Sequence, residues 1–302
     1  MKSNSPLKVG VLYGGNSEER DVSMQTGKAV MKACQSLGYK AIELELQVSL
    51  SPLIEAIKKM DVIFIALHGG SGENGQIQSE LKKIDAIYTG SGPESSALCM
   101  DKSASKNIAK SNSINTADWE TITENDLALI KIQCPFVVKP NDQGSTVGLS
   151  IVHKESELQA ALDIAFKFGD EIMVESYIDG RELTVAIIDG KAMPIVEIIP
   201  SHELYDYECK YTAGMSEYEC PANLSQNLSL QIQKDAVRLF EALGCEGYGR
   251  IDFLLDQNEK YYFLEMNTLP GMTSTSLVPK AVAARGDSFL DLVRQIIETA
   301  MK

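Results

Sequence analysis

The first third of the chain alternates between short hydrophobic runs and amphipathic segments, the pattern of strands connected by helices. We expect strands at residues 7–15, 41–48 and 61–67, and helices at 23–37 and 52–59. Because strand and helix alternate, the sequence predicts a parallel, doubly wound α/β sheet in this part of the chain.

From residue 136 onward, alternating β-rich runs replace this rhythm, and Asp189-Gly190 has the composition of a two-residue hairpin turn. A helical segment at 98–111 precedes this part. The runs lie at residues 135–140, 147–152, 171–178, 182–189 and 192–199, with helices at 156–168, 228–243 and 289–301. This part is therefore expected to be α+β, with antiparallel sheets covered by helices.

Two further strand-like runs, 250–255 and 261–266, flank a polar tetrapeptide of the length of a hairpin loop. Folding them symmetrically places Asp252 opposite Glu265 and Arg250 opposite Asn267. Alternation puts these four side chains on one face and an apolar set on the other, namely Ile251, Phe253, Leu255, Tyr262, Leu264 and Met266.

Carboxylates directly opposite each other destabilise a sheet, so this pair beside an amide oxygen indicates a hard cation, Mg2+ before most others. Arg250 would then meet an anion such as phosphate. The alternative is a solvated sheet face on which Arg250 neutralises one of the acids.

The composition of the chain limits the kinds of molecule that it is expected to bind. With 302 residues, 44% of them hydrophobic, the chain has enough material for more than one domain. Its net charge of −14 argues against nucleic acid as a partner. No run has the length of a membrane span and the polar start lacks a secretory pattern, so we expect no membrane partner and a cytoplasmic location. The six cysteines have no C-x-x-C spacing, so they indicate neither a zinc site nor a disulfide framework.

Lys139 ends a buried-looking strand, and the loop 141–148 that follows contains Gly144 and Gly148. A Gly-containing loop between antiparallel strands, with a lysine at its root, can place N–H groups and hydroxyls around phosphates. An ordinary hairpin loop fits equally well. A Walker-type site is disfavoured because no G-x-x-x-x-G-K-[ST] segment occurs.

Residues 70–75 satisfy G-x-G-x-x-G after a predicted strand and before a helical run, which makes an NAD-dependent dehydrogenase a rival interpretation. Against it, the motif follows the third strand of the domain, and no acid for a ribose lies about 20 residues further on. The same loop, with His68, could instead bind a small polar ligand at the start of a helix.

Nine segments taken in order resemble the ATP-grasp ligases, and most closely the family of D-alanine–D-alanine ligases. They are GGNSEERDVS, ALHGGSGENG, YTGSG, MDKSASK, FVVKPNDQGSTVG, VESYIDGRELTVAI, YDYECKY, GRIDF and LEMNTLPGMTSTSLVP. The resemblance implies an N-terminal substrate-binding domain (1–96) followed by a two-part ATP-grasp fold, with a central lid subdomain (97–180) and a C-terminal catalytic domain (181–302).

The resemblance also assigns roles to residues. For ATP it implies Lys102 and Lys139 at the phosphates, Glu175 at the adenine, Glu182 at the ribose, and Lys210. Two Mg2+ ions, with Mn2+ as a substitute, would be held by Asp252, Glu265 and Asn267.

Glu19 would bind the ammonium of a first D-alanine with His68 nearby, while Ser276 and Leu277 would hold the carboxylate of a second. Ser145 and Tyr211 would orient Glu19, and Arg250 and the Gly271 amide would stabilise an oxyanion.

The implied reaction phosphorylates one D-alanine and joins it to the second, giving D-alanyl-D-alanine for peptidoglycan precursors. In the family a Tyr at the position of Tyr211 goes with an amine acceptor instead of D-lactate. The resemblance further implies a homodimer. Another ATP-grasp carboxylate–amine ligase, the dehydrogenase and a non-catalytic nucleotide sensor remain alternatives.

Overall fold

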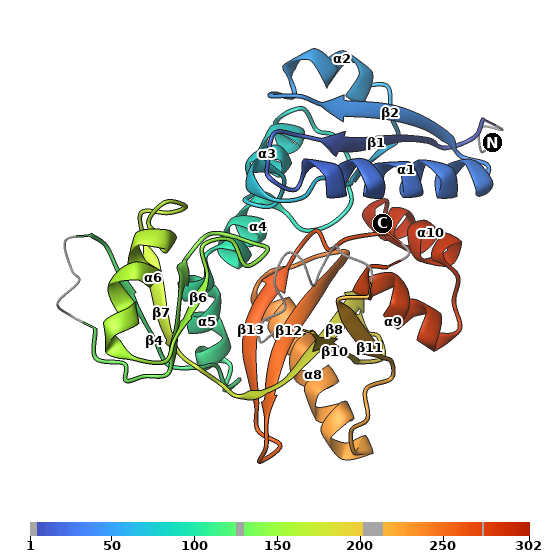
Figure 1. Ribbon diagram of the computed structural model, residues 1–302. Helices are drawn as coiled ribbons and strands as arrows, with labels where there is room; N and C mark the ends of the chain where they lie inside the picture. Colours follow the sequence, from blue (N-terminus) through green and yellow to red (C-terminus); the bar gives the residue numbers. More distant parts are fainter. Residues whose placement is uncertain (1–4, 125–129, 202–213, 274) are drawn as a thin grey trace.

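The computed structural model describes residues 5–124, 130–201, 214–273 and 275–302, which form three sheets with helices around them (Figure 1). The N-terminal sheet is parallel and has the order β2–β1–β3, as the alternating pattern predicted. Its strands are β1 (Lys8–Gly14), β2 (Lys40–Leu46) and β3 (Val62–Ile65), and its helices are α1 (Arg20–Ser36), α2 (Ile54–Ile57) and α3 (Gln76–Lys83). The helix predicted at 52–59 is shorter, because a 3-10 turn, Ser51–Leu53, precedes α2.

Two antiparallel sheets follow, also as predicted. The four-stranded sheet has the order β4–β7–β5–β6, with β4 (Trp119–Ile122), β5 (Phe136–Pro140), β6 (Ser150–Val152) and β7 (Ile172–Ser176). The six-stranded sheet has the order β11–β10–β8–β12–β13, and β9 pairs with β8. Its strands are β8 (Gly180–Ile188), β9 (Lys191–Ala192), β10 (Val196–Pro200), β11 (Ser216–Glu219), β12 (Tyr248–Asp256) and β13 (Tyr261–Asn267).

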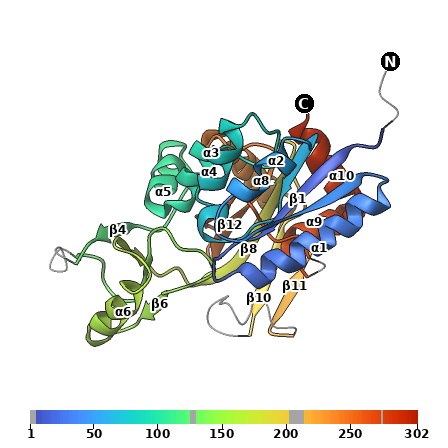
Figure 2. The ribbon, with the colours of Figure 1, turned by 90° about the horizontal axis from the view of Figure 1, so that it is seen from above.

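The turn between β8 and β9 is the predicted one, with positive φ at both Asp189 (50°) and Gly190 (70°). The run 192–199, predicted as one strand, is instead divided between β9 and β10. The four-stranded sheet and its helix α6 (Leu158–Ala165) project to one side of the rest of the molecule (Figure 2).

The helix predicted at 98–111 is in fact two helices, α4 (Pro93–Met100) and α5 (Lys102–Ser111). Asp101 separates them because its backbone is extended, and its side chain accepts a hydrogen bond from the Ala104 N–H as the N-cap of α5. The break makes Lys102 the first residue of a new helix.

The C-terminal part contributes α8 (Gln226–Ala242), α9 (Leu277–Arg285) and α10 (Phe289–Ala300). Residues of α9 and α10 belong to the same buried core as the N-terminal sheet, and α10 packs on α1 (Figure 1). The N-terminal sheet and the C-terminal helices thereby pack together, and the loop before α9 lies next to the N-terminal sheet. None of the helices in the described ranges is long and apolar enough to cross a membrane.

The hairpin register is confirmed at its functional end, where Asp252 pairs with Glu265 and Arg250 with Asn267. Beyond it the symmetric register is wrong, because a β-bulge makes Phe253 pair with Phe263. Phe263 is consequently buried in the core, whereas Leu264 and Tyr262, predicted as core residues, line a cavity on the other face.

Candidate active site

Two cavities of similar size meet at Glu265. The first, about 330 Å³, lies between the two antiparallel sheets and has lining residues in β5, β7, β8, β10, β12 and β13. The second, about 320 Å³, lies between the loops of the N-terminal sheet and residues 269–277. Glu265 contributes to the walls of both, so a group in one cavity can approach a group in the other.

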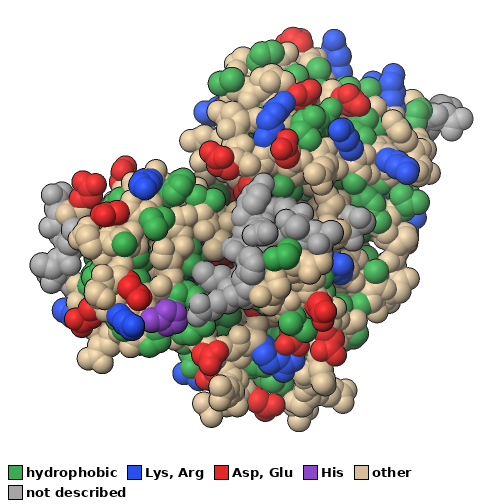
Figure 3. All heavy atoms as spheres, in the orientation of Figure 1, with side chains coloured by type: hydrophobic (Ala, Val, Ile, Leu, Met, Phe, Trp, Pro, Cys, Tyr) green, Lys and Arg blue, Asp and Glu red, His purple; other side chains and the backbone are tan. Residues whose placement is uncertain are grey.

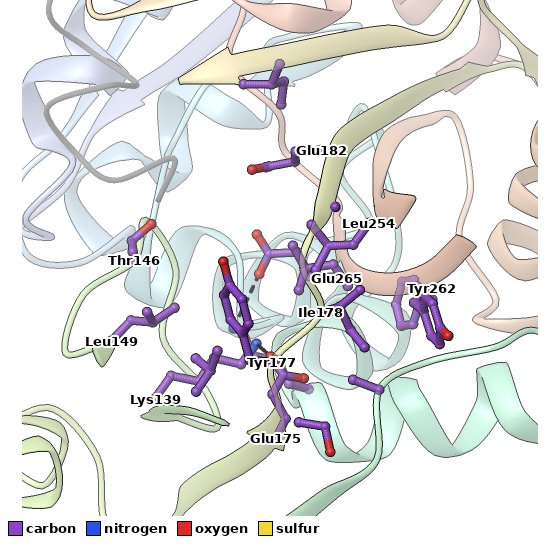
Figure 4. A pocket seen from close by; sticks show the side chains of 18 of the residues that line it. Lys139, Thr146, Leu149, Glu175, Tyr177, Ile178, Glu182, Leu254, Tyr262 and Glu265 are labelled. Carbon is purple, nitrogen blue, oxygen red and sulfur yellow. Dashed lines mark hydrogen bonds and ion pairs between the residues drawn. The ribbon is translucent and has the colours of Figure 1, made fainter. Parts of the chain in front are cut away.

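The first cavity combines charged and apolar walls. Lys139 and Glu175 lie at its lower end in Figure 4 and Glu182 near its upper end, with Leu254 and Tyr262 along one side. The two acids come from neighbouring sheets, Glu175 from β7 and Glu182 from β8. Such a cavity can hold a flat apolar group against its apolar wall and an anion beside its lysines.

One carboxylate in this cavity holds two lysines. Glu175 accepts a hydrogen bond from Lys106 Nζ at Oε2 over 2.7 Å and another from Lys139 Nζ at Oε1. Burial alone would raise the pKa of Glu175, but the charges of Lys106 and Lys139 lower it to about 2. Lys106 was not among the predicted residues, although its spacing of four from Lys102 puts both on one face of α5.

Lys102 connects the loop 141–148 to the hairpin. Its Nζ donates to the Gln143 carbonyl and lies 3.6 Å from Glu265 Oε2. Its backbone N–H donates to the Asn141 carbonyl over 3.1 Å, which fixes the start of α5 against the loop. Burial lowers the pKa of Lys102, and the neighbouring Lys139 lowers it further, while Glu265 acts in the opposite direction.

The loop 141–148 joins antiparallel strands, as predicted, and closes onto the N-terminal sheet. Ser145 Oγ donates to Glu19 Oε1 over 2.6 Å, a contact between residues 126 positions apart. Ser145 and Thr146 have φ values of 51° and 64°, a left-handed conformation that is strained for residues with a side chain. Paired strain of this kind in a loop at a cavity is typical of functional sites.

The G-x-G-x-x-G segment contributes to the second cavity. Its Gly70–Gly72 part forms a 3-10 turn, and Gly75 caps α3. His68 Nε2 lies 2.9 Å from Thr26 Oγ1, and its Nδ1 lies 3.6 Å from Glu73 Oε1. Loss of solvent raises the pKa of Glu73, and the nearby Glu19 raises it further, against the opposing effect of His68.

Glu73 is a cavity residue that the sequence analysis missed, although it is the single acid within the glycine motif. Together with Glu19 it makes this end of the second cavity acidic. A cationic group such as an ammonium is the ligand that two such carboxylates favour.

Asp252 is already paired in the structure. Arg250 donates to it through Nε (2.9 Å) and Nη2 (2.7 Å), and Asn267 Nδ2 donates to Oδ2 over 3.0 Å. The contact that the sequence offered as an alternative, Arg250 neutralising one acid, is thus present. It does not exclude a cation, because Glu265 and the Asn267 amide oxygen supply hard oxygen donors beside Asp252.

The protein alone supplies few metal ligands here. Within the described ranges, no group of three or more His, Cys, Asp or Glu side chains is arranged to hold a metal. The predicted set of two carboxylates and one amide therefore fits Mg2+ when other oxygens, such as those of phosphates, complete its coordination.

The other wall of the second cavity is formed by the loop before α9. Ser276 is the residue preceding the first turn of α9, and Leu277 begins the helix, so their backbone N–H groups lie where a helix favours anions. The Ser276 hydroxyl accepts from the Thr273 N–H over 3.0 Å. A Cβ on Gly271 would lie 2.8 Å from Ser276 Oγ, so a side chain at this position would displace the Ser276 hydroxyl.

Lys210 and Tyr211, predicted for ATP binding and for orienting Glu19, lie outside the described residues. All the other predicted site residues line one of the two cavities or contact a residue that does. Lysine and arginine side chains are interspersed with acidic ones over the face in Figure 3.

Comparisons with known proteins identify the family of the chain. Residues 103–298 match the family described as D-ala D-ala ligase C-terminus. A D-alanine–D-alanine ligase of Syntrophotalea carbinolica is 44% identical, over 97% of this chain and 96% of the relative. The corresponding ligase of Aquifex aeolicus is 45% identical, over 96% of this chain and all of the relative.

Solved structures of ligases also superpose on this chain over nearly its whole length. The D-alanine–D-alanine ligase of Bacillus anthracis, crystallised with ATP, is 35% identical and superposes with a TM-score of 0.86 over 99% of this chain and 98% of its own. The VanG D-Ala:D-Ser ligase of Enterococcus faecalis is 26% identical, with a TM-score of 0.86 over 98% of this chain and 100% of its own. These matches decide against the dehydrogenase and the non-catalytic sensor, and they confirm the resemblance seen in the sequence. The chain belongs to the family of D-alanine–D-alanine ligases.

Proposed function

We propose that the protein is an ATP-dependent ligase that joins two D-alanines into D-alanyl-D-alanine, through an acyl phosphate, for peptidoglycan precursors. The observation that carries the proposal is the meeting of a lysine-lined cavity and an acid-lined cavity at Glu265. A phosphoryl group passing from a nucleotide to an amino-acid carboxylate must cross such a junction.

ATP occupies the first cavity in this proposal. Lys102 and Lys139 face its phosphates, and the loop 141–148 covers them. Glu175 and Glu182 contact the adenine and the ribose at their ends of the cavity. The lysines of the first cavity stabilise the charge that develops during phosphoryl transfer.

The first D-alanine enters the second cavity with its ammonium at Glu19, which Ser145 orients, and with His68 nearby. The second D-alanine places its carboxylate at the start of α9, at Ser276 and Leu277. Its amine then lies between the helix end and the junction, in position to attack the acyl phosphate.

Asp252, Glu265 and Asn267 hold Mg2+ together with the nucleotide in this proposal. An Mg2+ or Mn2+ ion held by these three residues would supply neutralisation of the phosphate charge. Arg250, whose side chain is 14% exposed, and the Gly271 N–H stabilise the oxyanion that forms during attack. Closure of the loop 141–148 excludes water that would hydrolyse the acyl phosphate.

Several broader expectations belong to the same proposal. They are the domain boundaries 1–96, 97–180 and 181–302, the role of Tyr211 in selecting an amine acceptor, a cytoplasmic location, and a homodimer. Light scattering of the purified protein tests the last of these, since a single mass near 33.0 kDa would contradict it.

A ligase with another second substrate is the competing function, because the fold is shared with a D-Ala:D-Ser ligase. The test is phosphate release from MgATP with D-alanine alone, with D-alanine plus D-serine or D-lactate, and with L-alanine, followed by mass spectrometry of the product. D-Alanyl-D-alanine as the main product supports the proposal. A mixed product as the main one would move the assignment to the competing function, and no release with any substrate would refute both.

A further inference from the structure

Lys106 is a fully buried lysine one helical turn after Lys102. Its side chain is 1% exposed, and its Nζ lies 2.7 Å from Glu175 Oε2 and 5.4 Å from the centroid of the Trp119 ring. The Trp119 N–H donates to Ser103 Oγ on the same helix over 2.9 Å, so α5 holds both the ring and the lysine. A buried ammonium needs a partner, and Glu175 is the carboxylate beside it.

Glu175 is shared, because Lys139 is hydrogen-bonded to its other oxygen. Two ammonium groups and one carboxylate leave this cluster with a net positive charge, which a triphosphate in the same cavity would attract. Both lysines line the first cavity, but the side chain of Lys106 is 1% exposed, whereas that of Lys139 is 7% exposed and lies at the root of the loop 141–148. We therefore take Lys139 as the member that turns toward that anion. Its departure would leave Glu175 buried with no counter-ion if Lys106 were absent.

We propose, on the basis of the nucleotide site described above, that Lys106 is a positioning residue, the permanent counter-ion of Glu175 that releases Lys139 to the phosphates of the bound nucleotide. Lys106 does not itself contact the phosphates in this account. It acts through Glu175, which keeps its charge and its position after Lys139 has moved.

The test is direct binding of MgATP, measured by calorimetry without D-alanine. Lys106→Met should weaken ATP binding by about ten-fold or more, because Glu175 then retains Lys139. The KM for ATP should rise correspondingly, while the KM for D-alanine should stay within about two-fold of the parent value. Lys106→Arg preserves the charge and should restore most of the affinity.

Lys110 provides the matched control. It lies one turn further along α5, with its Nζ 4.4 Å from the centroid of the same Trp119 ring, but its side chain is 48% exposed and its ion-pair partner is Asp118. Lys110→Met should bind ATP like the parent. An equal loss of ATP affinity in Lys106→Met and Lys110→Met would contradict the proposal, because it would show that the lysines of α5 act through their charge in general and not through the pairing of Lys106 with Glu175.

A double variant separates pairing from packing. Glu175→Gln alone measures the effect of changing the adenine contact. When Lys106→Met is added to it, no carboxylate remains to retain Lys139, so the double variant should bind ATP about as tightly as Glu175→Gln alone. Binding weaker than in either single variant would overturn the proposal, as would parent-like affinity in Lys106→Met. If Lys106→Met does not give a cooperative thermal transition, Lys106→Gln supports the same comparison. A parent protein that fails to bind ATP would instead refute the proposed function.

Discussion

Replacing Ser145 by alanine removes the hydroxyl that donates to Glu19 over 2.6 Å and joins the loop 141–148 to the start of α1. A hydrogen bond to a charged group is worth about 1.5 to 3 kcal/mol. Each factor of ten corresponds to about 1.4 kcal/mol, so kcat/KM for D-alanine should fall about 10- to 100-fold. ATP binding should change much less, because Glu19 lies in the second cavity and not in the first.

Ser145→Gly separates the hydrogen bond from the backbone. At a φ of 51°, glycine relieves strain that alanine retains, while both substitutions remove the hydroxyl. The two variants should therefore lose similar activity, with the glycine variant unfolding at the higher temperature of the two. The assay is ADP release against D-alanine concentration at saturating MgATP. Full activity in Ser145→Ala, or recovery in Ser145→Gly, would refute the reasoning.

Three further predictions concern the hairpin and the buried cluster. Glu265→Gln should abolish phosphate release while the melting temperature changes little, because Glu265 is partly exposed and lies 3.6 Å from its ion-pair partner Lys102; a fully active variant would contradict the metal assignment. The pKa of Glu175 is lowered from 4.5 to about 2, so its ionisation stabilises the fold by about 3 kcal/mol above pH 4.5 and this contribution is lost as the pH falls toward 2. Urea unfolding of the parent and Glu175→Gln at pH 7 and pH 3 should thus show a smaller difference at the lower pH, and a constant difference would disprove the linkage. Phe263→Ala should destabilise the fold by about 3 to 5 kcal/mol, whereas Leu264→Ala should weaken ATP binding at nearly unchanged stability. Thermal unfolding and calorimetry of ATP binding test both variants, and greater destabilisation by Leu264→Ala than by Phe263→Ala would contradict the assigned faces.

The sheet types and the functional end of the hairpin were predictable because they depend on local alternation. The pairing of Asp252 with Glu265 needs the loop position and a period of two, and both are visible in the sequence. The bulge was not predictable from that period, since one extra residue leaves the apolar composition of β13 unchanged. It therefore exchanged the expected faces of Leu264 and Phe263.

The sequence contains a signal for the break between α4 and α5. Asp101 is a favourable N-cap residue directly before Lys102, and its side chain caps the Ala104 N–H in the structure. The burial of Lys106 had no such signal. It becomes evident only when α5 meets β7, because its partner Glu175 lies 69 residues away in the sequence.

Three cations of the described site lie beside carboxylates of the same site. Glu175 holds Lys139, Glu265 lies near Lys102, and Asp252 holds Arg250. For the cation, exchanging its carboxylate for an incoming anion costs little in desolvation, since one charged partner replaces another. The carboxylate that it leaves then needs a second cation, as Lys106 provides for Glu175. Lys102 contacts the loop 141–148 through the Gln143 carbonyl and lies next to Glu265 at the wall between the cavities. A nucleotide that draws Lys102 toward its phosphates would therefore change both the loop and the charge facing the second cavity, which couples nucleotide binding to the environment of the amino acid.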